Sequence, residues 1–222
     1  MLTAFTKFLG GIYRKLIGLD RNAARYWNRR LETYGKRAVL HLGHPNDEYE
    51  AVTEMQKNEI YPFFEKQIQT ADKLVLDLGC GLGRFTADLA EMIHGKALGI
   101  DVVQDFFEMA PRAEKVRYLP MRKETEIPLP DAYVDIVWIC LVLGGVQDKK
   151  LEKLVNEIKR VLKDGGLLFL IENTTAKESG GYWKFRSIER YLDLFSFVNL
   201  KHLHDYYDMS ERISIMAGRK RN

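Results

Sequence analysis

The chain has 222 residues, of which 46% are hydrophobic, and its formal net charge is +3. This length and apolar fraction suffice for the core of one domain. So small a charge disfavours a partner with many phosphates, so we expect no nucleic-acid binding. Two cysteines cannot build a disulfide framework or a cysteine metal site, which predicts a reducing compartment and no metal. The longest uncharged stretch, residues 136–147, is shorter than the ~18 residues of a membrane span, so we expect a cytoplasmic protein.

The segment before the first predicted strand departs from a bare catalytic core. Residues 1–20 place apolar side chains on one helical face, and basic and aromatic residues alternate over 21–37. A helix is predicted over 47–69, with Asp47 as its N-cap and a kink at Pro62. Three interpretations stay open: a cap with solvated charges, a basic and aromatic lid that grips an acceptor, and attachment of residues 1–20 to a membrane surface.

A buried strand and a glycine turn follow. Residues 74–78 are apolar and β-favouring, as in a parallel strand covered on both faces. The glycines that alternate over 79–83 let the backbone approach a ligand closely. Helical spacing after Arg84 places this turn at a helix N-terminus with unpaired N–H groups. Asp77 adds a carboxylate that would repel a diphosphate and suits a cationic amino acid moiety.

The next predicted strand, residues 97–101, ends in Asp101, about 20 residues beyond the turn. A carboxylate there can accept hydrogen bonds from both hydroxyls of a ribose. A dinucleotide dehydrogenase would share this feature. However, the glycines alternate as G-x-G-x-G and lack the tail that a pyrophosphate loop uses for close helix packing, which disfavours that class.

Strands and helices alternate along the rest of the chain, which predicts an α/β, doubly wound sheet. One helix is expected over 149–162, with Asp148 as its N-cap and an apolar stripe of core residues, and another over 182–195. The further strands are expected at 116–119, 135–142, 167–172, 197–207 and 212–218. The last of them alternates apolar and polar residues, as an antiparallel strand does.

The motif D-L-G-C-G-L-G-R over 77–84 resembles the first motif of class I S-adenosylmethionine-dependent methyltransferases, and Gly-Ile-Asp over 99–101 resembles their second. The resemblance continues in the order that the family requires, over about residues 70–175. It implies a seven-stranded, mostly parallel Rossmann-like sheet whose final strand is antiparallel. It places the methyltransferase domain over residues 71–222, and the residue pattern before it predicts a helical lid or interaction segment over residues 1–70.

The same resemblance implies S-adenosylmethionine as the cofactor, with Asp101 on its ribose and Val102 against its adenine. The family often binds the adenine amino group with an aspartate after the third strand, where this chain offers Glu124 or a backbone carbonyl. The expected cofactor-binding residues are Asp77, Gly79, Cys80, Gly81, Gly83, Asp101, Val102, Glu124 and Cys140.

A hydroxyl or phenol acceptor benefits from a general base, most often histidine or a carboxylate. Ligands bind outside the carboxyl ends of the strands, so the candidates are His41 and His44, in the turn before the second helix, and Glu172. Gly144 and Gly145 leave the loop after the fourth strand without a side chain for acid–base work. The candidate substrate-binding residues are Tyr26, Trp27, Arg30, Tyr34, Arg37, Trp183 and Arg186.

The aromatic and basic candidates predict a small-molecule acceptor with an oxygen nucleophile, a sugar hydroxyl or a phenol. Two alternatives stay open. One is a peripheral-membrane methyltransferase acting on a lipid-linked acceptor, with residues 1–20 as its membrane contact. The other is a regulatory protein that binds S-adenosylmethionine without turnover. A homodimer is the default expectation for assembly.

Overall fold

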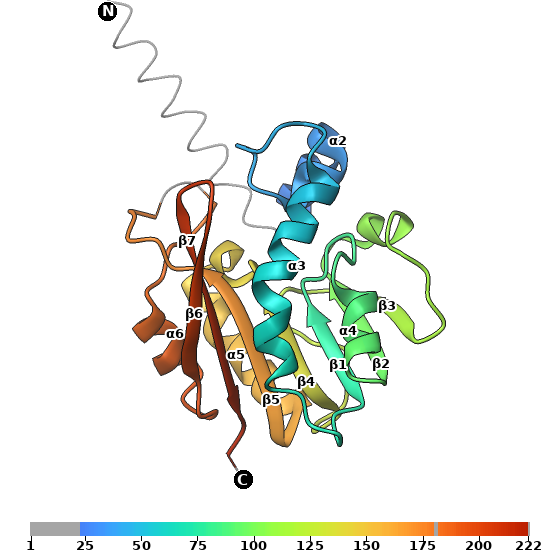
Figure 1. Ribbon diagram of the computed structural model, residues 1–222, viewed down its shortest axis with the longest axis vertical. Coiled ribbons are helices and arrows are strands. Elements are labelled where there is room, and N and C mark those ends of the chain that lie inside the picture. Colours follow the sequence, from blue (N-terminus) through green and yellow to red (C-terminus); the bar gives the residue numbers. More distant parts are fainter. Residues whose placement is uncertain (1–22, 180–181, 222) are drawn as a thin grey trace, which may run out of the picture.

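The computed structural model describes residues 23–179 and 182–221, so the predicted amphipathic start, residues 1–20, lies outside the described residues. Its centre is a seven-stranded sheet in the order β3-β2-β1-β4-β5-β7-β6 (Figure 1). The first five strands of this order run parallel, and β7 is antiparallel to both of its neighbours. The doubly wound sheet with an antiparallel final strand is therefore confirmed.

Most strands match the predicted segments closely, but β5 begins five residues earlier than expected and β6 begins four residues later. Their bounds are β1 Leu74–Leu78, β2 Lys96–Asp101, β3 Val116–Pro120, β4 Val134–Cys140, β5 Leu162–Asn173, β6 Lys201–Asp208 and β7 Glu211–Arg219. The α-helices are α2 Ala23–Tyr34, α3 Tyr49–Glu65, α4 Thr86–Met92, α5 Asp148–Val161 and α6 Ile188–Leu194. Residues 23–179 and 182–221 also form three short 3₁₀ helices: η1 Gly35–Val39, η2 Gln104–Glu108 and η3 Leu143–Gly145.

Helices cover both faces of the sheet, because alternate residues of each buried strand point to opposite sides. Helices α3 and α4 pack on one face, where the rings of Trp138 and Phe169 stack with their centroids 5.0 Å apart. Helices α5 and α6 cover the other face, with Ile158 and Tyr191 fully buried against it. Figure 1 shows α3 crossing the front of the sheet, below α2.

Three helix starts differ from the predicted ones. Helix α5 begins at Asp148 itself, and the Asp148 carboxylate pairs with Arg186 instead of capping the helix. Helix α3 begins at Tyr49, two residues after the expected cap, and contains Pro62 within its length. Helix α6 is much shorter than the predicted 182–195, because the Ser187 hydroxyl accepts the backbone N–H of Arg190 and starts the helix there.

Among residues 23–179 and 182–221, no helix has the length and apolar character needed to cross a membrane.

Candidate functional site

Two neighbouring cavities open beyond the carboxyl ends of the parallel strands. The first, of about 110 Å³, lies over the turn between β1 and α4, and we call it the glycine-loop cavity. The second, of about 310 Å³, lies between α2 and the β6–β7 hairpin, and we call it the hairpin cavity. The side chains of Trp27, Val39 and Leu141 line both, so the two cavities meet along a shared wall.

The turn that forms the floor of the glycine-loop cavity depends on its first glycine. Gly79 has a φ of +73°, and a Cβ atom there would lie 2.6 Å from a methyl group of Val142. Only glycine accepts this left-handed conformation and close approach without strain. The N–H groups of Gly79 and Cys80 both donate to the carbonyl of Ile100, at 2.8 and 3.0 Å, which fixes the turn to β2.

Two buried carboxylates lie in the wall of this cavity. Asp77 accepts a hydrogen bond from the Thr86 hydroxyl at 2.6 Å, and burial raises the pKa of Asp77 to about 7. Asp101 accepts the backbone N–H groups of Gly81 and Val103, each at 2.9 Å, and burial raises the pKa of Asp101 to about 6. Two carboxylates in one low-dielectric site favour a ligand with positive charge and hydrogen-bond donors.

The structure brings the predicted cofactor residues together, with one exception. Gly83 is not among the lining residues, because it packs against the ring of Tyr118. Glu124 lies at the cavity wall and forms an ion pair with Lys150. The lining residues among those predicted are Asp77, Gly79, Cys80, Gly81, Asp101, Val102, Glu124 and Cys140.

Sequence reasoning missed Arg84, which lines the same cavity. Its Nη1 atom donates to Oε1 of Gln56 at 2.7 Å, and its guanidinium lies 4.7 Å from the ring centroid of Phe85. The signal was available, since Arg84 directly follows the glycine motif. Because Arg84 was interpreted only as the start of a helix, its positive charge was not considered as part of a binding site. Trp27 and Tyr182 also line this cavity without having been assigned to it.

The hairpin cavity collects four of the predicted substrate residues: Tyr26, Trp27, Arg30 and Trp183. The ring of Tyr26 stacks on Tyr182, with centroids 3.7 Å apart, so α2 is held against the segment after β5. Trp183 comes so close to η3 that a Cβ atom on Gly144 would lie 2.2 Å from its ring. The indole of Trp183 therefore fits here only because residue 144 is a glycine.

The other predicted substrate residues lie elsewhere. Tyr34 is exposed on α2, with its ring 5.9 Å from the Arg30 guanidinium. Arg37 donates to the carbonyls of Leu42 and His44, which holds the turn before α3. Arg186 is buried and donates to the carbonyls of Leu143 and Val146, both at 2.7 Å, which holds the loop after β4.

The three candidate bases have different surroundings. His41 lines the hairpin cavity, where its Nδ1 accepts the N–H of Gly43 at 3.1 Å. His44 is buried, and its Nε2 lies 2.6 Å from Oδ1 of Asp208.

Glu172 is fully buried behind η3 and is not among the residues that line either cavity. Its carboxylate accepts the backbone N–H groups of Val142 and Leu143 at 2.8 and 2.6 Å, and burial raises the pKa of Glu172 to about 7. These contacts hold the loop after β4 in place.

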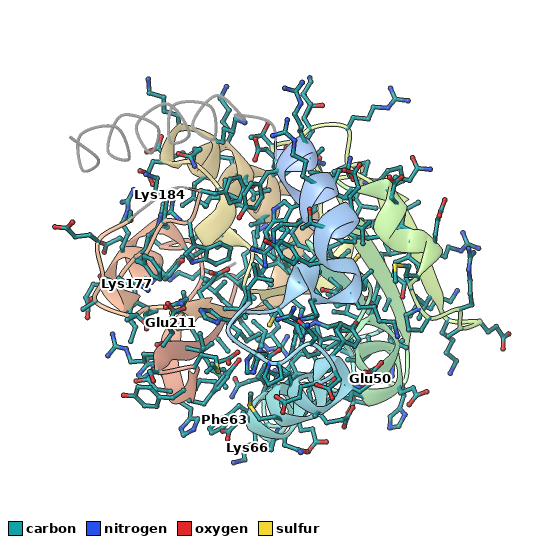
Figure 2. The ribbon with its side chains drawn as sticks, turned by 90° about the horizontal axis from the view of Figure 1, so that it is seen from above. Glu50, Phe63, Lys66, Lys177, Lys184 and Glu211 are labelled. Atoms are coloured by element: carbon teal, nitrogen blue, oxygen red, sulfur yellow. The ribbon has the colours of Figure 1, made fainter. Side chains whose placement is uncertain are left out.

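Two acidic residues of the hairpin cavity were missed, Asp208 and Glu211, at the two ends of the β6–β7 turn. Glu211 accepts from Nδ2 of Asn173 at 2.6 Å and from Nζ of Lys177 at 2.9 Å. Figure 2 shows Lys177 and Glu211 on adjoining segments of the same side of the molecule. A turn flanked by two carboxylates is an ordinary surface pattern, so the sequence carried no signal that it faced a cavity.

Within the described part of the chain, no group of three or more histidine, cysteine, aspartate or glutamate residues is arranged to hold a metal ion.

Residues 76–170 match the family described as "Methyltransferase domain". N-terminal Xaa-Pro-Lys N-methyltransferase 1 of Bos taurus is 30% identical over 115 residues, which are 49% of this chain and 51% of that protein. Ubiquinone/menaquinone biosynthesis C-methyltransferase of Vibrio vulnificus is 35% identical over 107 residues, or 44% of this chain and 40% of that protein. The chain thus spans about half, or less, of the length of these curated relatives.

Solved structures share the fold at low sequence identity. A SAM-dependent methyltransferase from Leishmania major has a TM-score of 0.67 and 21% identity, covering 89% of this chain and 81% of that one. A SAM-dependent methyltransferase from Aquifex aeolicus has a TM-score of 0.54 and 21% identity, covering 75% of this chain and 89% of that one. Together with the motifs and the sheet order, these findings identify a methyltransferase domain over residues 76–170 with the fold of class I S-adenosylmethionine-dependent methyltransferases.

Proposed function

We propose that the protein binds S-adenosylmethionine in the glycine-loop cavity and transfers its methyl group to an oxygen nucleophile of a small molecule in the hairpin cavity. One observation carries this proposal: the two cavities meet along Trp27, Val39 and Leu141. A methyl donor in one can therefore face an acceptor in the other, which is the geometry that direct transfer requires.

The glycine-loop cavity has complementary groups for each part of the cofactor. Asp77 offers a carboxylate to the ammonium group, and Arg84 offers a guanidinium to the carboxylate of the same amino acid moiety. Asp101 accepts from the ribose hydroxyls, and Val102 and Met121 supply an apolar wall for the adenine. Trp27, from α2, closes the cavity, which supports the division into a helical lid over residues 1–70 and a catalytic domain over 71–222.

When bound, S-adenosylmethionine supplies a methyl group on a sulfonium, which is already a good leaving group. The chain's own residues have to orient the acceptor and take its proton. Both ring nitrogens of His41 are engaged in this arrangement. Because its Nδ1 accepts the N–H of Gly43, the proton of the neutral imidazole lies on Nε2, 4.0 Å from a carboxylate oxygen of Glu211. We therefore assign proton acceptance in this cavity to its carboxylates.

The remaining predicted bases have supporting roles in this proposal. Glu172 holds the loop after β4, and His44 holds Asp208. Arg37 and Arg186 hold loops at the rims of the two cavities, since their guanidinium groups are bonded to backbone carbonyls.

The lining of the hairpin cavity supports a ring-bearing acceptor with several hydroxyl groups. Four aromatic side chains, Tyr26, Trp27, Trp183 and Phe185, offer faces on which a ring can stack. Asp208, Glu211 and Asn173 accept hydrogen bonds from hydroxyls, while Arg30 supplies a positive charge. Because both signs of charge are present, a neutral polyol such as a sugar, or a phenol, suits the cavity.

An amine acceptor is a second candidate, favoured by the two carboxylates at the ends of the β6–β7 turn. Carboxylates and aromatic faces together bind ammonium groups. The relative from Bos taurus is named an N-methyltransferase, which adds weight to this candidate. A lipid-linked acceptor at a membrane depends on residues 1–20, which lie outside the described residues.

Two measurements test the proposal. Calorimetry should show binding of S-adenosylmethionine by the wild type and its loss in Asp101→Ala. Tritium-labelled S-adenosylmethionine is then incubated with methyl glycosides, phenols and primary amines in parallel. Transfer to glycosides or phenols supports the oxygen acceptor, and transfer to amines alone supports the second candidate. Binding without transfer to any of these compounds would support a regulatory protein instead.

A further inference from the structure

A continuous line of hydrogen bonds connects the two cavities. Arg84 lines the glycine-loop cavity, and its Nη1 donates to Oε1 of Gln56 at 2.7 Å. Nε2 of Gln56 donates to Oδ2 of Asp208 at 2.9 Å, and both residues line the hairpin cavity. Oδ1 of Asp208 lies 2.6 Å from Nε2 of His44. We call these four residues the connecting chain.

The connecting chain joins segments that are far apart in the sequence. His44 precedes α3, Gln56 lies within α3, Arg84 precedes α4 and Asp208 ends β6. Three of these side chains are shielded from water, with exposed fractions of 1% for Gln56, 4% for Asp208 and 9% for His44, and Arg84 is partly buried. Buried polar groups are costly unless each finds a partner, so the members of such a chain hold one another in a single arrangement.

The chemistry of the side chains determines which group donates in each hydrogen bond of the connecting chain. An ionised carboxylate can only accept hydrogen bonds, so Gln56 must present its amide N–H group to Asp208. The amide oxygen of Gln56 then faces the opposite way, towards the guanidinium of Arg84. Asp208 thus orients Gln56, and Gln56 orients Arg84. The hydrogen bonds at both ends involve a charged group, which makes them stronger than neutral ones.

We propose that Asp208 and Gln56 are positioning residues that hold Arg84 for the carboxylate of the cofactor and thereby couple the acceptor site to cofactor affinity. The proposal rests on the proposed function. A hydroxyl of the acceptor that donates to Oδ2 of Asp208 shares that oxygen with Gln56 and weakens the hydrogen bond between them, so occupancy of the hairpin cavity is transmitted to Arg84. Such coupling between two sites is reciprocal: the cofactor changes acceptor affinity by the same factor.

The test uses the full chain and S-adenosylhomocysteine, the demethylated cofactor, so that no acceptor is needed. Calorimetry compares the wild type with Asp208→Ala, which removes the partner of Gln56. We expect affinity to fall about tenfold, the size of one lost hydrogen bond to a charged group. Asp208→Asn should restore affinity to within about twofold, because its amide oxygen still accepts from Gln56 and its N–H group can donate to His44.

Asp205→Ala is the matched control. Asp205 lies on the same strand, β6, and accepts from two partners, Ser214 and His202, at 2.6 and 2.8 Å. It is not among the residues that line either cavity or join Arg84. Asp205→Ala should bind S-adenosylhomocysteine with an affinity within about twofold of the wild type, since this change affects only the general stability of the fold.

Gln56→Leu supplies a second, independent readout. It breaks the connecting chain while leaving Asp208 in place, so it should weaken binding about tenfold, and adding Asp208→Ala should cause no further loss. It also replaces Asp208→Ala if that variant is unfolded by circular dichroism. Equal affinity in the wild type, Asp208→Ala and Gln56→Leu would overturn the coupling alone, as would an equal loss in Asp205→Ala. Absence of binding by the folded wild type would overturn the proposed function itself.

Discussion

Affinity for S-adenosylmethionine should rise with pH, and the replacement Asp77→Asn should remove most of that rise. Burial raises the pKa of Asp77 to about 7, and its carboxylate has to be ionised to attract the ammonium group of the cofactor. For a carboxyl of that pKa, about one tenth is ionised at pH 6 and about half at pH 7. The wild type should therefore bind about fivefold more tightly at pH 7 than at pH 6, which corresponds to about 1 kcal/mol.

The assay is calorimetric titration of both proteins at pH 6.0, 6.5 and 7.0. This window stays below the ordinary pKa of an α-amino group, about 7.8, so the ligand keeps its positive charge. Asp101 has a raised pKa of about 6 and titrates in the same window. It does so in both proteins, so the ratio of their affinities isolates Asp77. Asparagine still accepts the Thr86 hydroxyl through its amide oxygen, which preserves the local structure.

Two results would refute this reasoning. An equal pH dependence in the wild type and Asp77→Asn would show that the ionisation of Asp77 does not control binding. If the affinity of the wild type fell as the pH rose, ionisation of Asp77 would weaken binding, which is the opposite of the predicted effect.

Four further predictions concern stability and the two cavities. Because burial raises the pKa of Asp77 from 3.8, its contribution to stability is fully present below that ordinary value and is lost as the pH rises through about 7. The Tm of the ligand-free wild type should therefore fall between pH 5 and 8, and fall less in Asp77→Asn; an equal fall in differential scanning calorimetry would contradict this. Asp101→Ala should weaken S-adenosylmethionine binding at least about tenfold in calorimetric titration, since Gly81 and Val103 lose the acceptor of their N–H groups; unchanged affinity would argue against this site. Glu172→Ala should lower the Tm by about 10 °C, because removal of a buried acceptor of several N–H groups costs about 3 kcal/mol; a loss below about 2 °C would refute the holding role. Gly144→Ala should displace Trp183 and reduce methyl transfer while leaving S-adenosylhomocysteine affinity within about twofold, as checked by tritium transfer and calorimetry; unimpaired transfer would remove Trp183 from the acceptor site.

Local signals were sufficient for the sheet and for most of the first cavity. The bounds of β1 agree with the predicted segment, because a short apolar run between a lysine and a glycine turn can form little else in this context. The glycine turn and the two acidic residues at the ends of β1 and β2 came together for a similar reason. Adjacent parallel strands bring their carboxyl ends to one edge, whatever lies elsewhere in the chain.

Helix starts were less predictable, because several polar residues near each start could serve as the cap. Asp148 was expected to cap α5, but an ion pair with Arg186, 38 residues further along the chain, holds it in the first turn instead. The charged pair is a tertiary contact, and no pattern within the helix indicates it. The same holds for Arg186 itself, whose cationic side chain suggested a substrate contact until its carbonyl partners were visible.

The sequence by itself determined the class of domain, the succession of strands along the chain and the position of the glycine motif, because each of these depends on residues close together in the chain. The tertiary structure alone decided the hairpin cavity and the connecting chain. Gln56 and Asp208 are 152 positions apart, and hydrogen bonding between them requires α3 to pack on the sheet so that Gln56 reaches the end of β6. Such contacts depend on how the layers pack, and packing distances are not encoded in any local spacing of residues.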